Sequence, residues 1–121
     1  MRRALIIDDA DSARLTFAAL LQDAGYEVVE AESVAEGRRH LGNGTFALAI
    51  VDLNMPDGLG TLLLPDLRRA HPEAVIAMLS GNDLGPVAGA DLMLTKGEAP
   101  DALLKKIEQA VCAQQARGGK S

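Results

Sequence analysis

Five polar residues with chemically useful side chains stand at, or shortly beyond, the ends of apolar stretches of this sequence. They are two adjacent acids, a third acid, a hydroxyl and an amine: Asp8, Asp9, Asp52, Ser80 and Lys96. Carboxylates provide the hard oxygen ligands that Mg²⁺ prefers, and a carboxylate can also act as a nucleophile. A hydroxyl and an ammonium group stabilise the negative charge of a phosphoryl group. If the five side chains meet in space, we expect metal-dependent transfer of a phosphoryl group to a carboxylate.

The three acids would repel one another in a shared pocket. Two carboxylates about 5 Å apart cost on the order of 3 kcal/mol at an effective dielectric constant near 20. A divalent cation would remove this repulsion, and Lys96 can pair with Asp52 before phosphorylation and with a phosphoryl oxygen afterwards. Asp52 is the best nucleophile candidate, because it follows the most apolar stretch of the chain, residues 46–51, which we expect to be the central strand.

The chain alternates between stretches typical of strands and stretches typical of helices. Strands are expected over residues 4–7, 27–31, 46–51, 74–79 and 92–94, and helices over 12–24, 33–41, 61–70 and 101–116. Continuously apolar strands are typical of a parallel sheet covered on both faces. The alternation therefore predicts an α/β fold, a doubly wound five-stranded parallel sheet with right-handed connections. Such sheets bind ligands at the carboxyl ends of their strands, where the five polar residues fall.

Length and composition limit the classes of function. A chain of 121 residues has room for one domain, which we place at residues 1–116, with a flexible tail at 117–121. A net charge of −5 and only three aromatic residues argue against direct nucleic-acid binding. The apolar start of the chain is too short to span a membrane. One cysteine, Cys112, fits a reducing cytoplasm and a packing role, while His40 and His71 are expected on the surface.

Several motifs together resemble the receiver domain of two-component response regulators, with a likeness to chemotaxis regulators that covers residues 1 to about 116. The segments that carry the resemblance are 6–9, 50–56 with Gly60, 79–81, and 89–91 leading to 94–96. The resemblance implies a flavodoxin-like receiver fold. It also implies that Asp52 takes its phosphoryl group from a sensor histidine kinase or a histidine phosphotransfer protein. Signalling to a downstream effector protein would follow, without enzymatic action on other molecules.

The same resemblance implies roles for the remaining site residues. Mg²⁺ would be held by Asp8, Asp9, Asp52 and the backbone carbonyl of Asn54, directly or through water. Ser80 and Lys96 would contact the phosphoryl group. We expect a single-domain regulator, with a fragment of a longer protein as the alternative.

Three features depart from the pattern of the family. Met93 stands where an aromatic switch residue is usual, and Gly97 replaces the proline, often with a cis bond, that usually follows the lysine. The segment between Ser80 and Lys96 is about six residues shorter than usual and contains Gly81, Gly85 and Pro86, so a fourth helix should be short or absent there. We expect residues 81–89 to form a loop that orders on phosphorylation or partner binding.

Two other functions are weighed against the phosphoacceptor. A pseudo-receiver would keep the fold as an unphosphorylated interaction module, which the departures favour and the complete set of five polar residues disfavours. A haloacid-dehalogenase-type phosphatase would use the segment Asp9-Ala10-Asp11 as its nucleophile motif, but it would leave Asp52 idle. It would also need an acidic metal-binding pair after the lysine, where only Glu98 and Asp101 follow.

Overall fold

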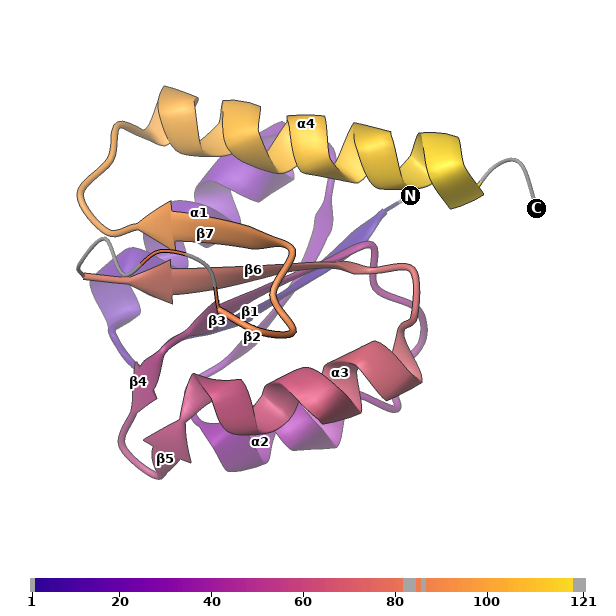
Figure 1. Ribbon diagram of the computed structural model, residues 1–121. Helices are drawn as coiled ribbons and strands as arrows, with labels where there is room; N and C mark the ends of the chain where they lie inside the picture. The colour runs from indigo at the N-terminus through magenta and orange to yellow at the C-terminus, as the bar shows by residue number, and fades with distance from the viewer. Residues whose placement is uncertain (1, 82–84, 86, 119–121) are drawn as a thin grey trace.

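The protein folds around one parallel five-stranded sheet (Figure 1). The computed structural model describes residues 2–81, 85 and 87–118. In spatial order the strands are β2 (Glu27–Ala31), β1 (Arg3–Ile7), β3 (Leu48–Asp52), β6 (Val75–Ser80) and β7 (Leu92–Thr95). All four strand pairs are parallel. The α/β doubly wound fold predicted from the sequence is therefore confirmed, with β3 at the centre.

Two pairs of helices cover the sheet (Figure 1). Helices α1 (Asp11–Asp23) and α4 (Pro100–Gly118) lie on one face, and α2 (Val34–His40) and α3 (Leu64–Ala70) lie on the other. None of the helices within the described ranges is both long enough and apolar enough to cross a membrane.

The sheet divides the apolar core into two halves. Consecutive side chains of a strand point to opposite faces, so Ala4 and Ile6 of β1 pack with the α1 and α4 side, while Leu5 and Ile7 pack with the α2 and α3 side. Strand β3 is buried along its whole length. This arrangement explains why the strand stretches of the sequence are continuously apolar rather than alternating.

A small antiparallel hairpin follows the central strand, where the sequence predicted only a loop. It pairs β4 (Asn54–Met55) with β5 (Gly58–Leu59) and leads into η1, a 3-10 helix (Gly60–Leu63). Pro65 lies in the first turn of α3, so the regular helix begins at Leu64 and not at residue 61, where the sequence pattern placed its start.

Between β6 and β7 the described residues contain no helix, in agreement with the prediction of a short or absent fourth helix. Residues 82–84 and 86 lie outside the described residues, and with them most of the loop that we expect to order on phosphorylation. At the other end of the chain, α4 extends to Gly118, and residues 119–121 of the expected tail also lie outside the described residues.

Two expectations about single residues were wrong. His71 is buried rather than exposed: its Nε2 lies 3.0 Å from the carbonyl oxygen of Leu41, and its ring meets Phe46 edge-on at 5.2 Å. Cys112, expected to pack inward, is exposed on α4. The buried positions of α4 recur at Leu103, Ile107 and Val111, so Cys112 lies off this face.

Candidate functional site

The carboxyl ends of four neighbouring strands bring the predicted polar residues to one edge of the sheet. Asp8 follows β1, Asp52 ends β3 and Ser80 ends β6, and all three side chains are buried. Lys96 follows β7 and is partly buried. The parallel register aligns Asp52 with Leu79 of β6, and Ser80 with the last residue of β7, so the strand ends are level.

Three carboxylates form a cluster at this edge. One oxygen from each of Asp8, Asp9 and Asp52 lies within 4.8 Å of the others. Asp8 is fully buried, whereas Asp9 is exposed to solvent. Burial raises the pKa of Asp8 to about 6, and the charge of Asp52 contributes further to this increase, although the backbone N–H of Ala10 and the charge of Lys96 oppose it.

The Lys96 side chain reaches into the cluster. Its Nζ lies 3.1 Å from Oδ2 of Asp52 and 3.7 Å from Oδ2 of Asp8. Desolvation alone would lower the pKa of Lys96, but its hydrogen bond to Asp52 and the attraction of Asp8, Asp52 and Asp9 outweigh desolvation and raise it. The amine therefore stays charged and offsets part of the repulsion among the acids.

The donor atoms of the cluster fit a hard divalent cation. Oδ1 of Asp8 accepts a hydrogen bond from the backbone N–H of Ala10, at 2.9 Å. Oδ2 of Asp8 is buried and accepts no hydrogen bond from any described residue. A buried carboxylate oxygen without a donor is costly, and a cation shared with Asp9 and Asp52 would satisfy it. Oxygen ligands of this kind, with few protein donors, suit Mg²⁺, which keeps several waters.

Asn54 and Ser80 border the same edge. The backbone N–H of Asn54 donates to Oδ1 of Asp52 at 3.3 Å, while the Asn54 side chain is exposed. The backbone carbonyl of Ser80 accepts from the N–H of Lys96 at 2.8 Å, which joins the ends of β6 and β7. These contacts fix the main chain on both sides of the phosphoacceptor candidate.

Gly60 makes a close approach to the backbone of Asp52. A Cβ atom at this position would lie 2.0 Å from the Asp52 carbonyl oxygen. The N–H of Gly60 donates to the carbonyl of Leu53 at 2.7 Å, so the chain returns from the hairpin directly against the end of β3. Only glycine fits without displacing the site.

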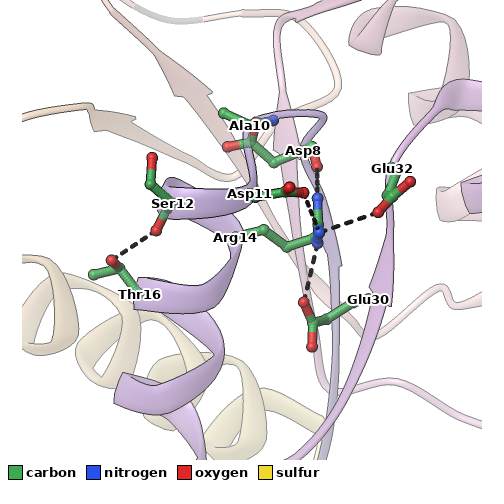
Figure 2. Close-up of polar contacts among 8 residues, drawn as sticks. All are labelled: Asp8, Ala10, Asp11, Ser12, Arg14, Thr16, Glu30 and Glu32. Carbon is green, nitrogen blue, oxygen red and sulfur yellow. Dashed lines mark hydrogen bonds and ion pairs between the residues drawn. The ribbon is translucent and has the colours of Figure 1, made fainter.

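Arg14 of α1, which the sequence analysis did not single out, supports the loop that carries the first two acids (Figure 2). Its side chain is only 8% exposed. Nη1 donates to the backbone carbonyl of Asp8 at 2.9 Å, and the other guanidinium nitrogens pair with Asp11 at 2.6 Å, Glu30 at 3.0 Å and Glu32 at 3.2 Å. A guanidinium group can serve all four acceptors because its five donors are fixed in one plane.

Asp57 is a second residue that the sequence analysis missed. From the β4–β5 turn its carboxylate accepts from the backbone N–H groups of Val34 and Ala35, at 2.9 and 3.1 Å. These two hydrogen bonds lower the pKa of Asp57; the bond from Val34 has the largest effect and the bond from Ala35 the next largest. Ser33, directly before α2, accepts from the N–H of Glu36 at 3.1 Å, so the start of α2 is capped both by the residue that precedes it and by the hairpin.

The acids needed by the phosphatase alternative are not at the cluster. The carboxylate of Glu98 accepts from the N–H of Thr95 and pairs with Lys106, and Asp101 is exposed in the first turn of α4. Within the described ranges, only the Asp8, Asp9 and Asp52 group has the spacing of a metal site among His, Cys, Asp and Glu side chains. In the sequence, the only sign of a role for Arg14 is that it is a basic residue close to several acids.

Comparison with known proteins is consistent with this geometry. Residues 4–110 match the family model described as the response regulator receiver domain. The photosynthetic apparatus regulatory protein RegA of Rhodobacter capsulatus is 36% identical over 104 residues, which is 85% of this chain and 55% of RegA. The chain thus spans about half the length of this relative, and less of the aerobic respiration control protein ArcA of Escherichia coli (44%).

Solved structures agree in fold. A CheY-like receiver domain protein from Methanospirillum hungatei superposes with a TM-score of 0.85 at 32% identity, over 97% of this chain and 98% of that chain. The response regulator TrrA of Thermotoga maritima, solved in complex with Mg²⁺ and BeF, has a TM-score of 0.81 at 27% identity, over 91% of this chain and 99% of that chain. TrrA has also been solved in complex with the histidine kinase ThkA. By fold and sequence, this chain belongs to the receiver domain family of two-component response regulators.

Proposed function

We propose that this receiver domain is a phosphoacceptor that takes a phosphoryl group onto Asp52, with Mg²⁺ held by Asp8, Asp9, Asp52 and the backbone carbonyl of Asn54. The observation that carries the proposal is the placement of the Lys96 ammonium 3.1 Å from Oδ2 of Asp52, within a cluster of three carboxylates. One acid is thereby paired with a fixed cation, beside two further acids suited to a metal ion.

The reaction forms one bond and breaks one. An oxygen of Asp52 attacks the phosphorus of a phosphohistidine, the phosphorus–nitrogen bond breaks, and the released imidazole takes up a proton from water. The product is an acyl phosphate on Asp52. Hydrolysis of that bond by water returns the carboxylate and releases inorganic phosphate, so the domain acts on itself and signals rather than serving as an enzyme for other substrates.

The residues around Asp52 supply positioning and charge. Bound Mg²⁺ would neutralise negative charge on the phosphoryl oxygens. The Lys96 ammonium, which pairs with Asp52 in the structure, would transfer its contact to a phosphoryl oxygen. The Ser80 hydroxyl, at the end of β6, would donate to another phosphoryl oxygen. The backbone N–H of Asn54, already bonded to Asp52 Oδ1, restrains the carboxylate orientation.

The phosphoryl donor that we propose as partner is a sensor histidine kinase or a histidine phosphotransfer protein. The complex of TrrA with a histidine kinase supports the assignment by similarity, as does the complex of TrrA with Mg²⁺ and BeF for the metal. The single cysteine fits a reducing compartment, so we place the domain in the cytoplasm, with a downstream effector protein as a further partner.

The test is treatment with acetyl phosphate, with and without Mg²⁺, followed by intact-mass measurement. The wild type should gain one phosphate only when Mg²⁺ is present, and Asp52→Asn should gain none. Asp23→Asn, an exposed acid at the end of α1, is the matched control and should behave as the wild type. Absence of labelling in the wild type would favour the pseudo-receiver, and multiple turnover of a phosphate ester would favour the phosphatase.

A further inference from the structure

The loop that carries Lys96 is built without the proline that the resemblance leads one to expect after this lysine. Gly97 follows Lys96 and adopts φ +96°, a left-handed conformation that glycine reaches without strain. No cis peptide bond occurs in the described part of the chain. The loop therefore turns at the most flexible residue type, directly beside the amine of the site.

Glu98 restrains this flexible turn. Its Oε2 accepts from the backbone N–H of Thr95 at 3.0 Å, and its own N–H donates to the Thr95 carbonyl at 3.3 Å. The two bonds close a tight turn around Lys96 and Gly97. The residue on each side of the Lys96–Gly97 pair is thus held by the other.

The geometry of the sheet explains why the Thr95 N–H needs such a partner. Strand β7 is at the edge of the sheet, so only one of its sides has a neighbouring strand (Figure 1). The N–H of Lys96 points to β6, where it donates to the Ser80 carbonyl at 2.8 Å. Successive N–H groups of a strand point to opposite sides, so the Thr95 N–H points to the open edge, and Glu98 supplies the acceptor there.

Lys106 of α4 holds Glu98 in this position. Its Nζ lies 2.6 Å from Oε1 of Glu98, while Oε2 serves Thr95. The Glu98 side chain is 26% exposed and that of Lys106 44%, so the pair lies at the surface between the loop and the helix. Two hydrogen bonds lower the pKa of Glu98: the one from Lys106 has the largest effect and the one from the Thr95 N–H the next largest. Glu98 therefore stays ionised at neutral pH.

We infer that Glu98, held by Lys106, is a positioning residue for the Lys96 amine: it fixes the β7–α4 turn from outside the sheet where the usual proline is missing. The inference rests on the proposed phosphoacceptor function only for its kinetic consequence. Glu98 touches neither the acids nor a phosphoryl group; it acts through the backbone of Thr95 and the turn at Gly97.

The test compares phosphorylation rates at saturating Mg²⁺, with acetyl phosphate as donor. A small displacement of a group that stabilises the transition state lowers rates strongly, so Glu98→Ala should be slower by roughly tenfold. Glu98→Gln keeps an acceptor for the Thr95 N–H and should lose at most about threefold, since charge alone is removed. Lys106→Met should fall between the two.

Two control variants and a Mg²⁺ titration separate positioning from general damage. Glu73→Ala and Lys105→Met remove exposed residues of the same types, the latter from the adjacent position of α4, and should match the wild-type rate. Mg²⁺ titrations followed by amide chemical shifts should give wild-type affinity for every variant, since the three acids are untouched. The inference would be overturned if Glu98→Ala were phosphorylated at the same rate as Glu73→Ala. It would also be overturned if Glu98→Ala lost Mg²⁺ affinity by the same factor as it lost rate.

A measurement without phosphorylation keeps the inference separate from the proposed function. The side-chain Cε and Hε resonances of Lys96 should move towards those of the exposed Lys105 in Glu98→Ala, and remain near the wild-type values in Glu98→Gln. If the wild type takes no phosphate, the proposed function fails, yet this comparison still decides the positioning role. Unchanged Lys96 resonances in Glu98→Ala would rule it out.

Discussion

The ammonium nitrogen of Lys96 lies 3.1 Å from Oδ2 of Asp52. Lys96 directly follows β7 and Asp52 ends β3, and β6 lies between these two strands, so the lysine side chain spans a whole strand to reach the central acid. Such a contact is possible only because the carboxyl ends of parallel strands lie level at one edge. It joins the central acid to an ammonium group 44 positions away in the sequence.

Replacement of Lys96 by methionine should separate metal binding from phosphorylation. Without the ammonium group, the repulsion among the three acids is less compensated, so Mg²⁺ should bind as tightly as in the wild type or more tightly. The phosphorylation rate should fall by roughly 10²-fold, because a fixed cation at the transferring group is lost. Amide-shift titration and intact-mass kinetics measure the two quantities. Equal rates in Lys96→Met and the control Lys105→Met would contradict the assignment.

The raised pKa of Asp8 predicts a specific dependence of stability on pH. Its pKa is about 6 in the folded protein, against an ordinary value of 3.8 for an aspartate side chain. Between these values the folded state binds more protons than the unfolded state, so the contribution of Asp8 to stability falls as pH rises through this window. In metal-free buffer at pH 8, Asp8→Asn should therefore unfold at higher urea, with a gain of roughly 1–3 kcal/mol.

Addition of Mg²⁺ should reverse that order. The wild type gains the free energy of metal binding, whereas Asp8→Asn, with one buried ligand oxygen fewer, should gain little. Asp23→Asn serves as the control and should follow the wild type in both buffers. A stability of Asp8→Asn below that of the wild type at pH 8 without metal would show that the buried carboxylate is not the source of strain.

Substitution of Gly60 by alanine should damage both stability and function. The added methyl group would overlap the Asp52 carbonyl oxygen, and relief requires movement of the end of β3 or of the hairpin. We expect a loss of about 2–3 kcal/mol in urea unfolding, together with slower phosphorylation. Gly42→Ala is the matched control, since a Cβ there meets no atom within 4 Å; similar losses in both variants would exclude a steric cause.

Replacement of Arg14 by methionine should loosen the loop after β1. The change keeps much of the buried aliphatic length but removes the donors to Asp8, Asp11, Glu30 and Glu32. Removal of one partner of a buried charged network leaves the others unpaired, so we expect a loss of about 2–4 kcal/mol. Amide exchange at residues 8–11 should accelerate. Arg39→Met, at an exposed arginine of α2, should change neither quantity, and unaltered exchange in Arg14→Met would refute a role in the loop.

The sequence predicted the sheet and the acidic cluster for the same physical reason. Buried parallel strands require continuous apolar runs, and such runs end in polar residues only where the chain leaves the sheet. Residues 46–51 followed by Asp52 show this directly, because every residue of β3 is buried and Asp52 ends it. Parallel strand order then brings separate strand ends together, so a one-dimensional pattern suffices to locate the site.

Contacts that depend on the packing of side chains could not be predicted from the pattern of apolar residues along the sequence. Arg14 lies near the start of α1. Its burial depends on contacts with Glu30 in β2 and with Glu32 directly after β2. His71 is buried because the end of α3 packs on Phe46, a contact between residues 25 positions apart. The two-residue strands β4 and β5 are too short to give a periodic signal.

The carboxylate of Asp57 connects the turn of the β4–β5 hairpin to the start of α2, two segments that are far apart in the sequence. Any rearrangement that pulls the segment beyond Asp52 must either carry α2 with it or break the bonds to Val34 and Ala35. A chemical change at the end of the central strand that moves the hairpin should therefore also move α2. Spectroscopic probes placed on α2 would report that event without touching the acidic edge.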